Sequence, residues 1–171
     1  PRGFALPLGG GPVLQVDARE GLAVWSPQLR RLAALELAGA ALQRCVLQPG
    51  GRRAAFVDAA GAVHGLDLVT GARTPIAPEG TEASALAIGL DGRRVAYGRR
   101  DGRIVCHDWD GAHVVDWPAH ATAITGLAFA PDGLLMSTGA DELAHVWDLA
   151  VLSRRRRGAL ASYRAEHELT C

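Results

Sequence analysis

The sequence contains no lysine and no asparagine, and it carries no excess of charge of either sign. All of its 18 basic residues are therefore arginines, and 18 acidic residues balance them. A balanced chain has no global field that draws it to nucleic acid or to an anionic membrane, so we expect it to bind neither. Because alanine and glycine are abundant, we attribute the arginines to a GC-rich bacterial coding bias and not to guanidinium chemistry.

The chain also lacks a long apolar run and a recognisable signal peptide. No segment approaches the roughly 20 apolar residues that are needed to span a bilayer. The first residues, PRGFALPLGGGP, have neither the basic start nor the uninterrupted apolar stretch of a signal peptide. We therefore expect a soluble protein, or the soluble part of a longer one, that makes no membrane contact.

Cysteine is scarce, and its spacing fits neither a disulfide framework nor a metal site. Cys45, Cys106 and Cys171 form no even-numbered set, which favours a reducing compartment and hence the cytoplasm. No C-x-x-C or H-x-x-x-H spacing occurs near Cys106 and His107, whereas zinc requires three or four converging ligands. We expect no metal and no cofactor.

The most informative feature that the sequence does have is an internal repeat. Equivalent turns follow one another at steps of 42, 41 and 41 residues, at Pro7, Pro49, Leu90 and Pro131. The end of a later apolar segment recurs at steps of 41, 41 and 40 residues, at Ser26, Asp67, Asp108 and Asp148. Two independent markers that keep one period through four copies indicate a repeat protein.

Each repeat is typical of short antiparallel strands. Its segments have ~5 to 7 residues, alternate apolar with polar side chains, and are separated by glycine-containing turns. In the last repeat ITGLAFA, LLMSTG and AHVWDL are the first three strands, and ALASY at 159–163 is the fourth. Four strands in ~40 to 45 residues is the spacing of a propeller blade. We predict an all-β β-propeller fold with four consecutive four-stranded antiparallel blades at approximately 1–37, 42–77, 83–117 and 123–163.

The stretch HATAITGLAFAPDGLLMSTGADELAHVWD, which ends at Asp148, resembles the WD-repeat (beta-transducin repeat) family. It has His120 before the first strand, a Pro-Asp-Gly turn, Ser137 on the second strand, Asp141 six residues before Trp147, and the closing Trp-Asp. The resemblance implies that these four side chains form a hydrogen-bonded network that binds the strands and loops of the blade together. In the other repeats the motif is degenerate, and the tryptophan position holds Trp25, Leu66 and His107.

Elementary chemistry also favours a structural role for these residues. An indole N–H and a hydroxyl that enter a packed sheet each need a hydrogen-bond partner. Ser137 lies in LMSTG, without the G-x-S-x-G elbow that exposes a nucleophile. His145, on the third strand, is expected to be a packed or surface residue. We therefore expect no catalytic residue and no enzyme activity.

The resemblance further implies a ring of seven or more blades. By the repeat register both chain ends fall inside a first strand, so we expect a fragment of a longer gene product, with 164–171 beginning a next blade. The missing sequence of the same chain would then supply the rest of the propeller. A ring closed by four blades is the alternative. The closing stretch LASYRAEHELTC also resembles the C-terminal propellers of bacterial multidomain signalling proteins.

We expect the protein to be a scaffold for a protein or peptide partner. Propellers of this family present the turn between the second and third strands to partners, and Arg99, Arg100 and Glu142 occupy this turn in two blades. The alternative is a regulatory or sensor arm of a bacterial signalling ATPase, kinase or caspase-like protease. Neither a G-x-x-x-x-G-K-[ST] loop nor a Cys/His protease pair occurs in the sequence. A propeller enzyme is disfavoured because the first strands, which line the channel, contain almost no acids or histidines.

Two segments test the repeat against local propensity. The stretch SPQLRRLAALELAG at 26–39 favours a helix, with Ser26 as N-cap and Pro27 in the first turn. The period instead makes 31–37 the fourth strand of the first blade, and we follow the period because tertiary pairing overrides propensity. The run of arginines at 154–157 is predicted to lie in a solvated loop between the third and fourth strands of the last blade.

Overall fold

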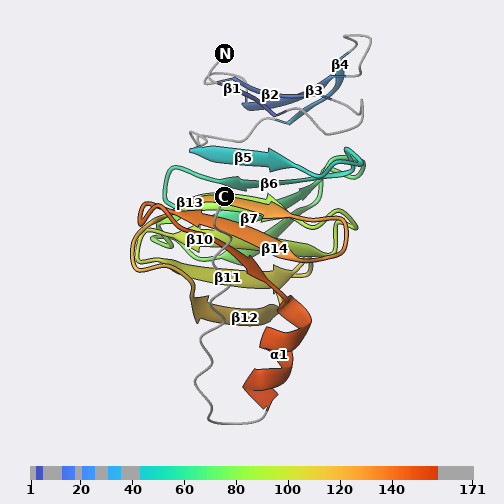
Figure 1. Cartoon of the computed structure of the whole chain (residues 1–171). Coiled ribbons are helices and arrows are strands. Elements are labelled where there is room, and N and C mark those ends of the chain that lie inside the picture. The colour runs from blue at the N-terminus through green and yellow to red at the C-terminus, as the bar shows by residue number, and fades with distance from the viewer. Residues whose placement is uncertain (1–2, 6–12, 18–20, 26–30, 36–42, 158–171) are drawn as a thin grey trace.

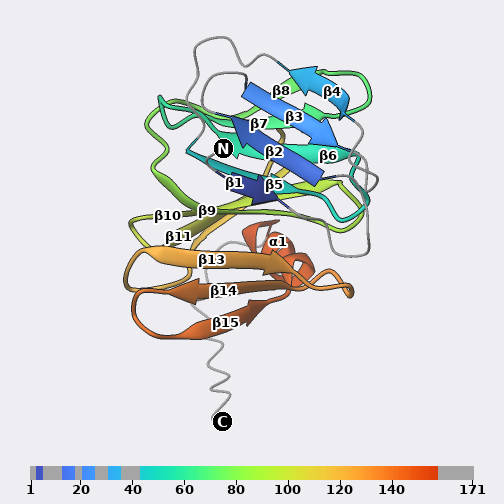
Figure 2. The same cartoon turned by 90° about the horizontal axis from the view of Figure 1, so that it is seen from above.

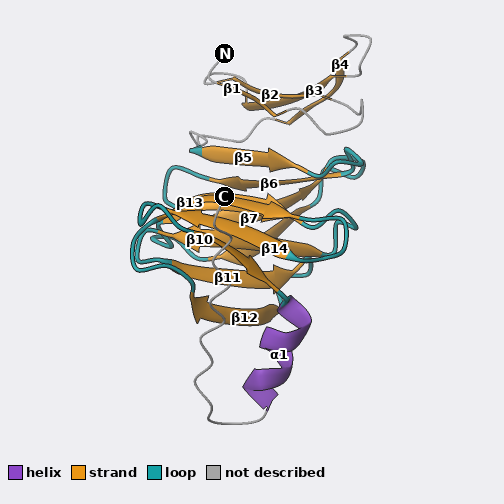
Figure 3. Cartoon of the chain, viewed as in Figure 1, coloured by secondary structure: helices purple, strands orange, loops and turns teal. Residues whose placement is uncertain are grey.

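The computed structural model describes residues 3–5, 13–17, 21–25, 31–35 and 43–157. Within these ranges the backbone forms fifteen β-strands and one helix, α1 (Leu149–Arg157) (Figure 3). This helix, the one described, is too short and too polar to cross a bilayer. The described residues are thus all-β apart from α1.

The strands form four separate antiparallel sheets (Figure 1). The first sheet contains β1 (Gly3–Ala5), β2 (Val13–Asp17), β3 (Gly21–Trp25) and β4 (Arg31–Leu35). The second contains β5 (Arg44–Leu47), β6 (Arg53–Val57), β7 (Val63–Asp67) and β8 (Arg73–Ala77). The third contains β9 (Ala83–Ile88), β10 (Arg94–Arg99), β11 (Arg103–Asp108) and β12 (His113–Pro118). The fourth contains β13 (Ile124–Phe129), β14 (Leu135–Gly139) and β15 (Ala144–Trp147).

Within each sheet the strands lie in chain order, and each pairs with the next across a short turn. The turns from the first to the second strand contain Gly92 (φ 71°) and Gly133 (φ 85°), whose left-handed backbone favours glycine. In each of these turns an aspartate carboxylate accepts a backbone N–H: Asp91 accepts that of Arg93, and Asp132 that of Leu134. Turn chemistry at fixed offsets therefore sets the strand lengths.

The sheets pack side by side through their first strands. Strand β9 lies next to β5 on one side and β13 on the other, so the later strands of each sheet extend outward from this contact (Figure 2). Such an arrangement of antiparallel sheets fits a propeller-like fold. The Ser84 hydroxyl joins the third and fourth sheets, because it lies 2.6 Å from the carbonyl oxygen of Ile124 and 3.2 Å from that of Gly98.

Two apolar clusters fill the spaces between consecutive sheets. The cluster between the second and third sheets consists mostly of small and branched side chains, with Tyr97 the aromatic one, and includes Val57, Val63, Leu86, Ile88 and Val95. The cluster between the third and fourth sheets includes Ala96, Ile104, Cys106, Ile124 and Leu135, and Leu149 of α1 extends it past β12. The second, third and fourth sheets therefore bury faces against one another, as stacked repeats do.

The outer face of the fourth sheet is exposed where the same face of the second and third sheets is covered. Met136 and Val146, which are paired across β14 and β15, are each 49% exposed. The equivalent pair on the third sheet, Ala96 and Cys106, is completely buried by the fourth sheet. The face of Met136 and Val146 is thus an apolar contact surface without a described neighbour.

The predictions for the two ambiguous segments had different outcomes. Strand β4 (Arg31–Leu35) pairs with β3, which confirms the strand that the period predicted in place of a helix. The prediction of a loop at 154–157 was wrong, because these residues end helix α1. Asp148 begins the helix: its carboxylate accepts the backbone N–H groups of Ala150 (2.8 Å) and Val151 (3.2 Å), which is N-capping. The strand predicted at 159–163 lies outside the described residues.

Candidate functional site

The structure brings the four motif residues of the last repeat into one hydrogen-bonded chain. His120 lies in the connection from β12 to β13, and its side chain is fully buried. Its Nδ1 is 2.9 Å from the Asp141 carboxylate, and its Nε2 is 2.8 Å from Ser137 Oγ. Trp147 Nε1 donates to the same hydroxyl at 2.8 Å.

These contacts fix the donor at the Asp141 end of the chain. A carboxylate only accepts, so the imidazole Nδ1 donates to Asp141, and Nε2 forms the hydrogen bond with the Ser137 hydroxyl. The hydroxyl oxygen in turn accepts from the indole N–H of Trp147. Every polar atom in this chain therefore has a partner inside the repeat, which joins strands β14 and β15 to the connection that precedes β13.

Asp141 anchors the open end of the network in the turn between β14 and β15. Its carboxylate also accepts the backbone N–H groups of Ala121 (3.1 Å) and Leu143 (3.2 Å). Burial alone would raise the pKa of this carboxyl, but the hydrogen bonds from His120 and from the backbone outweigh it, and the pKa lies below its usual value. Gly139 is required here, because a Cβ at this position would overlap Asp141 and the His120 ring.

The order carboxylate, imidazole, hydroxyl is also that of a hydrolase triad. A nucleophile must be reached by its substrate, however, and Ser137 is only 2% exposed. Its oxygen is occupied by the Trp147 N–H. His145 also covers the site, because its ring centroid lies 4.6 Å from that of His120. The pKa of His145 is lowered, mainly by burial and to a smaller extent by repulsion from His120. The geometry suits a buried hydrogen-bond network that stabilises the repeat, and a substrate has no access to Ser137 in this arrangement.

Residues 111–148 match the family model for "WD domain, G-beta repeat". The matched WD repeat contains the whole network, from His120 to Trp147, together with the strands that carry it. The match and the antiparallel sheets support the WD-repeat resemblance, and WD repeats generally mediate protein–protein interaction. No curated protein matches the chain.

The second sheet has a different polar pair, which the sequence pattern did not reveal. His64 Nε2 lies 2.8 Å from the Asp58 carboxylate, and Asp58 also accepts the backbone N–H groups of Ala60 and Ala62. At the positions of Ser137 and Trp147 this sheet has Phe56 and Leu66, which are both completely buried. The Asp58–His64 pair spans a hairpin turn, so only the strand register shows that the two residues are neighbours.

In the third sheet aromatic rings occupy the two equivalent positions. The rings of Tyr97 and His107 are stacked with centroids 5.8 Å apart. His107 Nδ1 lies 3.1 Å from the carbonyl oxygen of Gly111, at the turn that follows β11. The position of the WD tryptophan therefore keeps a packing role in all three described sheets that show their side chains, although its chemistry changes.

Of the three candidate partner-binding residues, Arg100 and Glu142 lie in the turns between second and third strands, and Arg99 is the last residue of β10 before this turn. Arg99 is partly withdrawn, because its guanidinium pairs with Asp101 at 3.1 Å and its Nε is buried. Arg100 and Glu142 are exposed. Glu142 has a left-handed backbone (φ 66°) at a position where the third sheet has Gly102 (φ 82°). A charged side chain is thus held outward at a turn whose conformation favours glycine.

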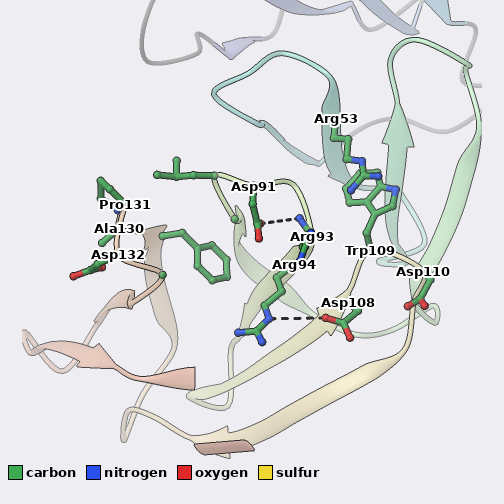
Figure 4. Close-up of a pocket in the computed structure, with 14 residues that line it drawn as sticks. Arg53, Asp91, Arg93, Arg94, Asp108, Trp109, Asp110, Ala130, Pro131 and Asp132 are labelled. Carbon is green, nitrogen blue, oxygen red and sulfur yellow. Dashed lines mark hydrogen bonds and ion pairs between the residues drawn. The ribbon is translucent and has the colours of Figure 1, made fainter. Parts of the chain in front are cut away.

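A cavity of about 830 Å³ lies at the opposite edge of the sheets from these turns. Its walls come from the turns β9–β10, β11–β12 and β13–β14, with Arg53 contributed by β6 (Figure 4). Sequence reasoning missed this cavity, because its walls come from three sheets and none of the repeats contains it alone.

Proposed function

We propose that the protein is a non-catalytic scaffold that presents the turns between second and third strands to a protein or peptide partner. The observation that carries the proposal is the division of polar groups in the WD repeat. His120 and Ser137 are buried and Trp147 is partly buried, and both rings are hydrogen-bonded to the Ser137 hydroxyl, whereas Arg100 and Glu142 in the turns are exposed. Groups that already have partners stabilise the scaffold, and groups without buried partners remain available for binding.

We also propose that a further sheet of the same kind covers the exposed face around Met136 and Val146. The second sheet is covered on this face by the third, and the third by the fourth. A ring of seven or more such sheets, with the remainder supplied by more sequence of the same chain, would leave no apolar face in water. The surrounding protein, on the resemblance of LASYRAEHELTC, would be a bacterial signalling ATPase, kinase or caspase-like protease that uses this scaffold as its regulatory arm.

The thiols favour the cytoplasm as the compartment of this scaffold. Cys45 and Cys106 are both free. Burial raises the pKa of each thiol to about 12, so both stay protonated and unreactive at neutral pH. Two free thiols, one buried at Cys106 and one partly buried at Cys45, suit a reducing environment, where no disulfide has to form.

The partner-binding turns are tested by a variant that carries Arg99→Ser, Arg100→Ser and Glu142→Gly. The immobilised wild-type chain and the variant are compared for the proteins that they retain from a bacterial lysate, quantified by mass spectrometry. We expect partners of the turn edge to fall at least about fivefold, which corresponds to loss of about 1 kcal/mol of binding free energy. Stability should not fall, because glycine is the favoured residue at a backbone with positive φ.

The matched control removes two exposed arginines from the opposite edge, as Arg52→Ser with Arg73→Ser. A partner whose retention falls equally in both variants binds through non-specific attraction to arginine and not through the turns. If the folded wild-type chain and the Arg99→Ser, Arg100→Ser, Glu142→Gly variant retain the same proteins in the same amounts, the turns are not the binding edge and the proposal fails.

Ser137→Ala separates a scaffold from a hydrolase. We expect the free energy of unfolding to fall by about 1–2 kcal/mol, because the Trp147 N–H and the His120 ring each lose a buried partner. Partner retention should be unchanged. The measurements are urea unfolding, partner retention, and hydrolysis of generic ester and peptide substrates. Loss of a measurable hydrolysis with unchanged stability would show that this serine is catalytic.

A further inference from the structure

The cavity at the opposite edge has the composition of a recognition groove. Trp109 and Phe129 are half-buried in its walls, and Pro131 is exposed at its rim. Its volume of about 830 Å³ falls within the range of protein ligand sites, which combine apolar walls with a few converging polar groups. Because the cavity opens across neighbouring turns, its shape suits an extended segment.

Two of the three arginines in the groove are engaged by the protein itself. The Arg53 guanidinium donates to the carbonyl oxygen of Gly92 and lies over the Trp109 ring, 4.6 Å from its centroid (Figure 4). Arg94 Nε is 3.9 Å from the Asp108 carboxylate. These contacts neutralise or cover much of the positive charge in the walls.

The carboxylates of the groove keep free capacity. Asp91, Asp110 and Asp132 each use Oδ1 to accept the backbone N–H two residues ahead, at 2.9, 2.9 and 3.1 Å. All three are exposed, and a carboxylate has a second oxygen and several lone pairs. Within the described residues the charge that remains available is therefore mainly negative, which complements a cationic side chain.

A second observation concerns the wall of the groove. Arg53 Nε is buried and has no hydrogen-bond partner among the described residues. Buried donors without a partner are rare in folded proteins, and each one carries a desolvation cost. This donor is covered, so it can gain a carbonyl partner only if the partly buried Arg53 side chain shifts when a peptide binds along the wall. The groove itself offers carboxylates to a cationic side chain and apolar surface to its neighbour.

We propose that this groove binds an extended segment of a partner protein that carries an arginine or lysine followed by an apolar side chain. The cation contacts the second oxygens of Asp91 and Asp132, and the apolar side chain packs on Phe129 and Pro131. This second site lies at the edge opposite Arg99, Arg100 and Glu142, so its test is independent of the test of the binding proposed for those turns.

The test uses the full 171-residue chain and fluorescein-labelled hexapeptide pools. One pool has Arg-Leu fixed at its centre, a second has Glu-Leu, and a third has Ala-Leu. We expect the arginine pool to bind at least about tenfold more tightly than the glutamate pool in fluorescence anisotropy, and to weaken with salt. The variant Asp91→Asn with Asp132→Asn should reduce arginine-pool binding at least about fivefold.

Asparagine keeps the side-chain oxygen that caps each turn, so this variant changes charge and leaves the turns intact. The matched control is Asp101→Asn, since Asp101 caps the backbone N–H of Arg103 in the same way at the opposite edge. It should leave arginine-pool binding unchanged. The proposal is overturned if the glutamate pool binds as tightly as the arginine pool, if Asp101→Asn weakens binding as much as the groove variant, or if no pool binds at about 1 mM.

Discussion

Replacing His120 by alanine should lower the free energy of unfolding by about 3 kcal/mol. The imidazole is fully buried and holds both Asp141 and Ser137, at 2.9 and 2.8 Å. Its removal leaves a cavity and deprives the hydroxyl of one partner. Urea unfolding followed by circular dichroism measures the loss, and we expect a lower midpoint with an unchanged slope.

The matched control for this substitution is His113→Ala. His113 is exposed on β12, where its ring meets that of His107 edge-on at 5.3 Å. Its loss should cost no more than about 1 kcal/mol. The double variant His120→Ala with Ser137→Ala should be less destabilised than the sum of the single variants, because both changes break the same chain. Equal stabilities of the two histidine variants, or strict additivity, would contradict a network role.

Gly102→Ala should destabilise the protein by at least about 3 kcal/mol. Gly102 has φ 82°, and a Cβ there would overlap the carbonyl oxygen of His120 and lie 2.8 Å from that of Thr122. Its own carbonyl accepts the backbone N–H groups of Ala119 and His120, at 3.0 Å each. The connection to the fourth sheet therefore folds directly onto this glycine, and a methyl group would displace His120 from the network. Thermal unfolding measures the effect.

Gly133→Ala is the control that isolates steric overlap from backbone conformation. Gly133 has almost the same φ (85°), but a Cβ there would meet nothing within 4 Å. Only the intrinsic cost of a left-handed alanine applies, which is about 1 kcal/mol. If both alanine variants lose the same stability, the close contact between Gly102 and His120 has no energetic weight.

The period of the sequence predicted the strands better than local propensity did. Residues 31–35 have helical propensity and a leucine pattern that suits a helix, yet they form β4, because pairing with β3 continues the sheet. The helix α1 was missed in spite of a local signal. Asp148 followed by LAVL is a plausible N-cap and first turn, but the arginines that follow drew attention to their charge.

Site residues were visible in the sequence only where one motif carries them. His120, Ser137, Asp141 and Trp147 share one repeat, so the resemblance of that repeat to the WD family identified them as a set before their positions were known. Other contacts depend on geometry between elements. The Asp58–His64 pair requires the register of β6 with β7, and the groove requires three neighbouring turns to meet. A linear pattern contains neither kind of information.

The side chains that the third sheet contributes to its contact with the fourth increase in size from its inner strand outward. Ala85 and Ala87 of β9 and the bare backbone of Gly98 separate the sheets at the centre, whereas Trp117 and Leu149 separate them near β12 and α1. Two surfaces held apart by thin spacers at one end and thick spacers at the other diverge as a wedge. The volumes of these residues therefore set the angle at which the fourth sheet is turned from the third about their inner strands.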